Sequence, residues 1–346
     1  MSRSPPYHVS VIMAGLWPPA PQAQLRLAGL ELLLARGERE ASEPGSLDTM
    51  LFRALGASVP SGDLPVAAVT RILDMGVVDS EWWFRADPVH LVARRDGLVL
   101  VPGGLLDLPL DEAQRLCEEL GQHYEAEGWL LRAPHPWRWY LRPPRVPDVQ
   151  TTPLALAVGH DVHACLPTGN EARSWHTLLN EMQILLHAAR VNAEREQRGA
   201  PSINSLWFWG GGRVPRVTAS DFDFLWTDEV VAQGLSRLSG IPTQSLPEGF
   251  EAWRDSASPG RHLIVLGSPH QAAQDDAEAG WSVRLADLEN RWFRPLTDAV
   301  CSGTIAQLTL TTDQGLVCRA TGRQLRRWWR RRRPLSGFTP SRPLSA

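Results

Sequence analysis

The chain contains no lysine, and all 35 of its basic residues are arginine. This absence excludes a Walker-type phosphate-binding lysine, a Schiff-base lysine and a lysine general base. Cysteine is also scarce, and the four cysteines show no CxxC spacing. We therefore predict neither a zinc ribbon nor a disulfide scaffold, and we expect buried thiols in a reducing compartment.

Long hydrophobic runs are missing as well. No apolar stretch approaches the ~18 residues that a spanning helix needs, and the N-terminus has no signal-peptide pattern. Hydrophobic residues make up 43% of the 346-residue chain and charged residues 21%, which is typical of a folded globular protein. From these features we expect a cytoplasmic protein without a transmembrane segment.

Strand and helix patterns alternate at both ends of the chain. Buried strands are predicted at 7–16, 261–267 and 305–310, and helices at 22–37, 171–189, 223–240 and 281–300. The middle of the chain favours antiparallel strands with one helix. These patterns predict a doubly wound α/β core from residues 1–80 and 155–334, an inserted α+β subdomain at 81–150 and a disordered tail at 335–346.

The candidate site follows from a buried apolar run that leads into three glycines, a place where a strand brings its backbone close to another group. Backbone donors beside arginine bind anions, so this stretch is a candidate anion or ligand site. Its residues are Asn192, Arg195, Asn204, Gly210, Gly211, Gly212 and Arg213. Arg85 and Asp87, near a proline-fixed turn, are further candidates, although a structural ion pair at a strand edge is the favoured interpretation of the two.

Two other patterns allow alternative interpretations. His160, Asp161 and His163 suggest metal ligands, but strand geometry would place the two histidines on opposite faces, and a solvated loop is the favoured interpretation. The segment Arg323–Arg333 contains two adjacent tryptophans. It fits a weak contact with nucleic acid or an anionic surface, or a helix end whose tryptophans pack on the core.

The spacing of Asn192, Arg195, Gly199, Asn204, Gly210, Gly212 and Pro215 resembles that in archaeal-type cofactor-independent phosphoglycerate mutases, a branch of the alkaline-phosphatase superfamily. The chain resembles RpfE-type bacterial regulatory proteins over nearly its whole length. The segments that carry this resemblance are 86–91, 180–187 and 204–212. Both resemblances imply an alkaline-phosphatase-like core sheet.

The chain departs from the mutase pattern where that family holds two divalent metal ions and a serine nucleophile. Ala14-Gly15 replaces an Asp-Gly after the first strand, residues 268–273 replace an Asp and a Gly-His-Asp, Gln314 replaces a His, and Trp209 replaces an Arg. The resemblance thus implies a regulatory pseudoenzyme with no catalytic residue, metal ligand or cofactor, which binds a small anion or a protein partner.

The alternative is an active phosphoglycerate mutase or phosphatase whose metal ligands have moved to other positions. The side chains available for such a site are Asp74, Asp87, His90, His160, Asp161, His163 and Asp313.

Overall fold

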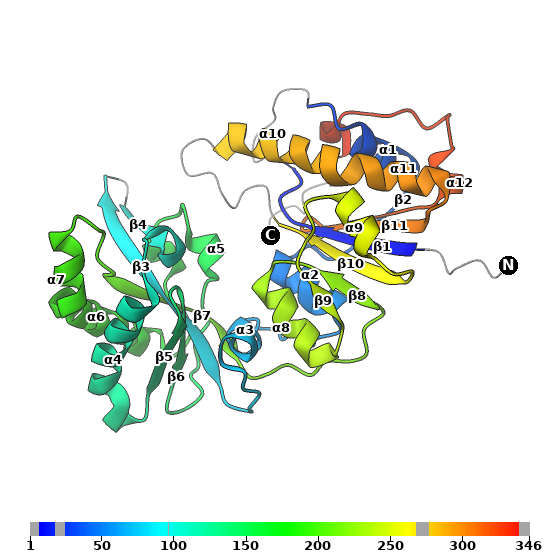
Figure 1. Ribbon diagram of the computed structural model, residues 1–346. Helices are drawn as coiled ribbons and strands as arrows, with labels where there is room; N and C mark the ends of the chain where they lie inside the picture. Colours follow the sequence, from blue (N-terminus) through cyan, green and yellow to red (C-terminus); the bar gives the residue numbers. More distant parts are fainter. Residues whose placement is uncertain (1–6, 18–24, 96, 268–276, 339–346) are drawn as a thin grey trace. The chain divides into compact units, whose positions relative to one another are not determined.

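The computed structural model describes residues 7–17, 25–95, 97–267 and 277–338. The chain forms two compact units (Figure 1). We call residues 1–57 with 217–346 the core unit, and residues 58–216 the inserted unit.

The described part of the core unit contains a seven-stranded sheet. Its strands are β1 (Tyr7–Met13), β2 (Glu38–Ala41), β8 (Phe224–Trp226), β9 (Thr243–Gln244), β10 (Arg261–Leu266), β11 (Ile305–Thr312) and β12 (Leu316–Ala320). The order across the sheet is β2-β12-β11-β1-β10-β8-β9. The strands from β11 to β9 run parallel, whereas β12 and β2 are antiparallel to their neighbours. The carboxyl ends of β1, β8, β10 and β11 therefore meet at one edge.

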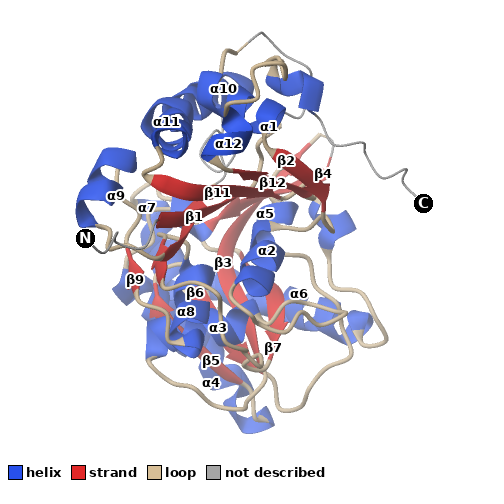
Figure 2. Cartoon of the chain, turned by 90° about the vertical axis from the view of Figure 1, so that its right-hand side faces the viewer, coloured by secondary structure: helices blue, strands red, loops and turns tan. Residues whose placement is uncertain are grey.

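Helices cover both faces of this sheet, with α1, α10 and α11 on one face and α2 and α8 on the other (Figures 1 and 2). The helices of the core unit are α1 (Ala28–Arg36), α2 (Leu47–Ala54), α8 (Val230–Ser239), α9 (Phe250–Ser256), α10 (Ala277–Leu288), α11 (Arg294–Ser302) and α12 (Gly322–Leu325). Coverage of both faces explains why β1 ends in an apolar run from Val11 to Met13 and β10 in one from Leu263 to Leu266, rather than in alternating patterns.

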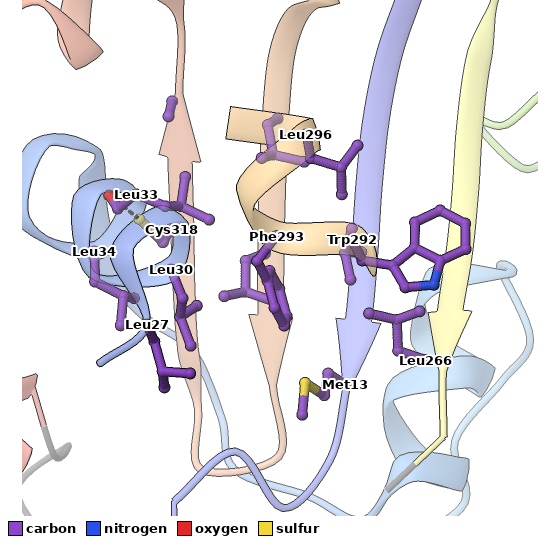
Figure 3. Close-up of a cluster of buried hydrophobic side chains, with 14 of the residues drawn as sticks. Met13, Leu27, Leu30, Leu33, Leu34, Leu266, Trp292, Phe293, Leu296 and Cys318 are labelled. Atoms are coloured by element: carbon purple, nitrogen blue, oxygen red, sulfur yellow. Dashed lines mark hydrogen bonds between the residues drawn. The ribbon is translucent and has the colours of Figure 1, made fainter. Parts of the chain in front are cut away.

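The core of this unit lies between the sheet and the helices α1 and α11, which cover one of its faces. Leu30, Leu33 and Leu34 of α1 follow helical spacing and are fully buried, and Figure 3 shows them packed over the strands. A π-helical turn, Glu289–Phe293, joins α10 to α11 and delivers Trp292 to the same cluster. This packing fixes β1, and with it the residues that follow its carboxyl end.

The inserted unit is an antiparallel sheet flanked by helices. Its strands are β3 (Trp83–Arg94), β4 (Gly97–Pro102), β5 (Leu130–His135), β6 (Arg138–Arg142) and β7 (Ser205–Gly212), in the order β4-β3-β6-β5 with β7 also paired to β3. Its helices are α3 (Val66–Met75), α4 (Leu110–Tyr124), α5 (Leu154–Ala157), α6 (Ala172–Ala188) and α7 (Arg190–Gln197). α4 and α6 pack on one face of the sheet, and α3 packs on the other.

The mixed α/β fold, with a doubly wound core sheet and an inserted α+β unit, is the fold predicted from the sequence, and the structure confirms it. The boundaries differ, because the inserted unit spans 58–216 instead of 81–150. The physical reason is that β7 pairs with β3, with Trp209 opposite Arg85, so α6, α7 and β7 belong to this unit. The helix predicted at 223–240 is also shorter, since its first part forms β8.

The tail predicted as disordered from 335 is partly folded. Leu335 and Phe338 are buried in the core cluster, and residues 339–346 lie outside the described part of the chain. Within the described residues, no helix combines the length and apolar character needed to cross a bilayer.

Candidate functional site

Arg85 and Asp87 form a buried ion pair on one face of β3. Two residues apart on a strand, their side chains point the same way, toward the face that α3 covers. Nε and Nη2 of Arg85 donate to Oδ1 of Asp87 at 2.9 and 2.7 Å, and Nε1 of Trp209 donates to Oδ2 at 2.8 Å. These contacts are those of a structural ion pair, the alternative to a binding site for Arg85 and Asp87.

The surroundings of this pair close it to solvent. Asp87 is 1% exposed and Arg85 6%, and the Arg85 guanidinium lies 5.6 Å from the ring centre of Tyr140 and 5.3 Å from that of Trp209. Burial raises the pKa of Asp87 above its usual value, and Arg85 and Trp209 oppose that rise. A ligand would have to displace these contacts to reach either charge.

A second polar cluster lies on the same side of the inserted unit. Nε and Nη2 of Arg138 donate to the two carboxylate oxygens of Asp74 at 2.8 and 2.6 Å. The Tyr140 hydroxyl also donates to Asp74 and lies 3.1 Å from Oγ1 of Thr70. Burial disfavours the charged form of Asp74, but the bonds from Arg138 and Tyr140 outweigh burial and lower its pKa.

Asn192 and Arg195 hold loops of the inserted unit together. Nδ2 of Asn192 donates to the carbonyls of Leu186 and Ile203 at 2.7 and 2.8 Å. Arg195 is 0% exposed, and its guanidinium donates to Glu112 at 2.7 Å and to three backbone carbonyls, those of Leu106, Asp107 and Pro201. Their donors are thus engaged inside the fold.

Asn204 and the three glycines serve the pairing of β7. The Asn204 side chain exchanges two hydrogen bonds with the backbone of Leu91, at 2.7 and 2.9 Å, and so extends the pairing of β7 with β3. Gly210 has φ +64°, and a Cβ at Gly211 would lie 2.3 Å from Cε1 of Phe84. A Cβ at Gly212 would likewise lie 2.5 Å from Cβ of Pro65, so the group that approaches this backbone closely is the protein itself.

Arg213 differs from these residues because it is exposed. Its Nη1 donates to the Ser80 carbonyl. Of the residues proposed from the sequence, the structure brings Arg85 and Asp87 together, beside the ring of Trp209. The other side chains bond to different partners. They are Asn192, Arg195, Asn204 and Arg213.

The carboxyl edge of the core sheet is a second place where α/β proteins bind ligands. After β1, Leu16 is 0% exposed and Trp17 4%. The N–H of Gly15 donates to Oδ2 of Asp313 at 3.1 Å, and the Gly15 carbonyl accepts from Nε1 of Trp281 at 3.0 Å. The backbone beyond β1 is therefore fixed from both sides and flanked by indole rings.

Asp313 and Glu229 are the carboxylates to consider at this edge. Oδ1 of Asp313 is buried and has no hydrogen-bond partner among the described residues. Glu229 follows β8, and burial, with smaller effects of Asp48 and Asp228, raises its pKa. Sequence reasoning missed Trp281 and Glu229, because Trp281 lies 266 residues from Gly15 and no motif marks either residue.

The side chains considered as relocated metal ligands are dispersed within their units. His90 bonds the Ser202 carbonyl at 2.7 Å, Asp161 and His163 contact each other at 3.2 Å on the surface, and Asp74, Asp87 and Asp313 have the partners given above. No group of three or more His, Cys, Asp or Glu residues is arranged to hold a metal ion within the described chain. The predicted replacement at residues 268–273 lies outside it.

The close approach at Gly211 predicts a clear cost for a side chain there. Gly211→Ala should lower the free energy of unfolding by about 2 kcal/mol, because Phe84 and β7 must move apart. Gly121→Ala in α4 is the matched control, since a Cβ there meets nothing within 4 Å and should stabilise the helix by up to about 1 kcal/mol. Chemical unfolding of both variants measures this, and equal effects would contradict the packing role of Gly211.

The Asp74 cluster predicts a pH-dependent contribution to stability. Because the folded-state pKa of Asp74 is lowered, its stabilisation is complete above the unfolded pKa and is lost as pH falls through the folded pKa. Asp74→Asn should therefore lower the free energy of unfolding by about 3 kcal/mol at neutral pH, and the difference should shrink toward about pH 3. Denaturant titrations at several pH values test this, with exposed Glu127→Gln as control, and a pH-independent difference would refute it.

Comparisons with known proteins relate this chain to one group of enzymes. No protein-family model matches it. It is 24% identical over 248 residues to a probable 2,3-bisphosphoglycerate-independent phosphoglycerate mutase of Geobacter sulfurreducens, a match that covers 67% of this chain and 60% of that protein. Another curated relative is matched over only 18% of its length, so less than two thirds of either relative is spanned.

Two solved structures also resemble the chain. The PH0037 protein of Pyrococcus horikoshii gives a TM-score of 0.57 at 13% identity, covering 92% of this chain and 88% of that one. A cofactor-independent phosphoglycerate mutase of Thermoplasma acidophilum gives 0.49 at 18% identity, covering 97% and 95%. The chain is thus similar in sequence to cofactor-independent phosphoglycerate mutases, in keeping with the alkaline-phosphatase-like α/β fold expected for it.

Proposed function

We propose that this chain is a non-catalytic, RpfE-type regulatory protein that keeps a mutase-like fold and acts by binding a small anion or a protein partner. The observation that carries this proposal is the end of β1. Ala14 and Gly15 stand where the mutase resemblance calls for a carboxylate, and the Gly15 backbone is bonded to Asp313 and Trp281. Buried Leu16 and Trp17 follow directly.

Two-metal phosphoryl transfer needs several charged oxygen or imidazole ligands close together. At the described part of this edge, Asp313 alone matches a ligand position of the resemblance, and one of its oxygens already accepts from Gly15. Within the described residues no three His, Cys, Asp or Glu side chains gather to hold a metal ion, which does not fit a pair of divalent ions. The described part of this edge therefore does not provide the ligands for two-metal phosphoryl transfer.

Among the candidate arginines, exposed Arg213 is the one suited to bind an anion. Arg85 and Arg195 direct their guanidinium groups to Asp87 and Glu112 inside the fold. The side chain of Arg213 is exposed directly after β7, and the guanidinium N–H groups that do not bond to Ser80 can donate to an anion. A regulatory role follows from the RpfE-type resemblance.

The alternative, an active phosphoglycerate mutase or phosphatase, is favoured by a different observation. The similarity to the Geobacter protein extends over 248 residues, and Oδ1 of Asp313 is buried without a described partner. An unpaired buried carboxylate oxygen is costly, and a bound cation would offset that cost.

Turnover separates the two functions. The purified chain is incubated with 3-phosphoglycerate and Mn²⁺, Co²⁺ or Mg²⁺, and 2-phosphoglycerate is followed with a coupled enolase reaction. We expect no product above the enzyme-free blank. The proposal is wrong if the chain forms product with a metal ion and if Asp313→Asn abolishes this activity while the exposed Asp255→Asn leaves it unchanged.

A further inference from the structure

The segment from Arg326 to Pro334 forms an exposed loop in which six of nine residues are arginine and the central pair is Trp328 and Trp329. We call it the Arg-Trp loop. The sequence left two readings of this segment, one in which the tryptophans pack on the core and one in which they contact an anionic surface. The exposed fractions of Trp328 and Trp329 are 78% and 64%, so neither indole packs on the core.

The exposure of these tryptophans does not come from a free chain end. Leu325 on one side of the loop and Leu335 and Phe338 on the other are buried in the core cluster. Across the loop, the Arg36 guanidinium donates to the carbonyls of Leu325 and Arg330, and Arg330 donates to the carbonyl of Gly37. The loop is therefore fastened at both ends and presents its indoles on a folded support.

The charged residues of the loop itself are all arginine. No Asp or Glu follows Asp313 in the sequence, and Arg331, Arg332 and Arg333 are all exposed. Glu38 compensates part of this charge by approaching Arg327 at 3.5 Å. The loop thus combines an exposed apolar tip with a cationic flank, and its complementary partner is an anionic surface that can also accept indole rings.

We propose that the Arg-Trp loop attaches the protein to the surface of a bilayer that contains anionic phospholipids. Arginines near such a surface each strengthen binding, and tryptophan rings favour the headgroup boundary. Binding at such a surface grows with the apolar area buried and with the attraction to anionic lipids, and the loop supplies both in adjacent residues. It requires no membrane-spanning helix.

The ring geometry favours a bilayer over a single-stranded nucleic acid. The Trp328 and Trp329 rings are 6.1 Å apart and nearly perpendicular, with an interplanar angle of 85°. Successive bases of one strand stack on aromatic faces that follow the strand, which perpendicular neighbours do not provide. Insertion into the headgroup region imposes no such requirement on ring orientation.

Sedimentation with vesicles tests this proposal on the full chain. Vesicles of phosphatidylcholine mixed with phosphatidylglycerol should bind the chain at least about tenfold more strongly than phosphatidylcholine alone, and sodium chloride should reverse the binding. Replacing Arg331, Arg332 and Arg333 with Gln should weaken binding about a hundredfold, at roughly fivefold for each arginine. Replacing both Trp328 and Trp329 with Ala should weaken it about tenfold.

Matched control variants distinguish binding through the Arg-Trp loop from nonspecific binding through other exposed arginines or tryptophans. Arg94→Gln with Arg95→Gln removes exposed arginines elsewhere, and Trp137→Ala removes an indole that is 42% exposed. Both controls should bind vesicles as the unaltered chain does. Brominated phospholipid should quench part of the tryptophan fluorescence of the unaltered chain, and this quenching should disappear in the Trp328/Trp329 double variant.

Three results would overturn the proposal. They are no binding of the unaltered chain to the anionic vesicles, unchanged binding of the Trp328/Trp329 variant, and single-stranded oligonucleotide binding that exceeds vesicle binding and depends on the same two tryptophans. Thermal unfolding of each variant, followed by circular dichroism, verifies that the fold is retained.

Discussion

The two hydrogen bonds that hold the Gly15 backbone define what the core unit can do. Asp313 accepts from its N–H and Trp281 donates to its carbonyl, so the segment after β1 is fixed between the last parallel strand and α10. In an open α/β sheet this edge is where ligands and catalytic groups gather. Here the described residues after β1 are Ala14, Gly15 and two large buried apolar side chains.

The inserted unit carries the residues that the sequence suggested as a binding site. Their contacts show that such residues can instead stabilise the fold. Arg195 links a helix and three loop carbonyls without exposure to solvent, and Arg85 is neutralised by Asp87 between aromatic rings. Breaking buried pairs of this kind leaves an unpaired charge, which is expensive. Their contribution to stability is therefore enough to explain why these residues are buried and paired.

Much of the fold could be predicted from the sequence, because β1, β10, β11, α4 and α6 have clear periodicity. The pairing of β7 with β3 could not, since Asp87 and Trp209 lie 122 residues apart and local patterns carry no register across that distance. The boundaries expected for the inserted unit differ from the observed ones for the same reason. The candidate residues were singled out from the sequence as possible anion or ligand contacts, and the structure shows that Asn192 and Asn204 bond backbone groups and that Gly211 makes room for Phe84.

Direct measurement of divalent metal binding tests the central claim that the mutase-like fold lacks a two-metal site. Calorimetric titration of the full chain with Mn²⁺ includes the ligands of every segment, those outside the described residues among them. The account predicts no saturable binding at metal concentrations up to about 1 mM. Binding of two ions per chain at micromolar concentrations, weakened by Asp313→Asn, would contradict it.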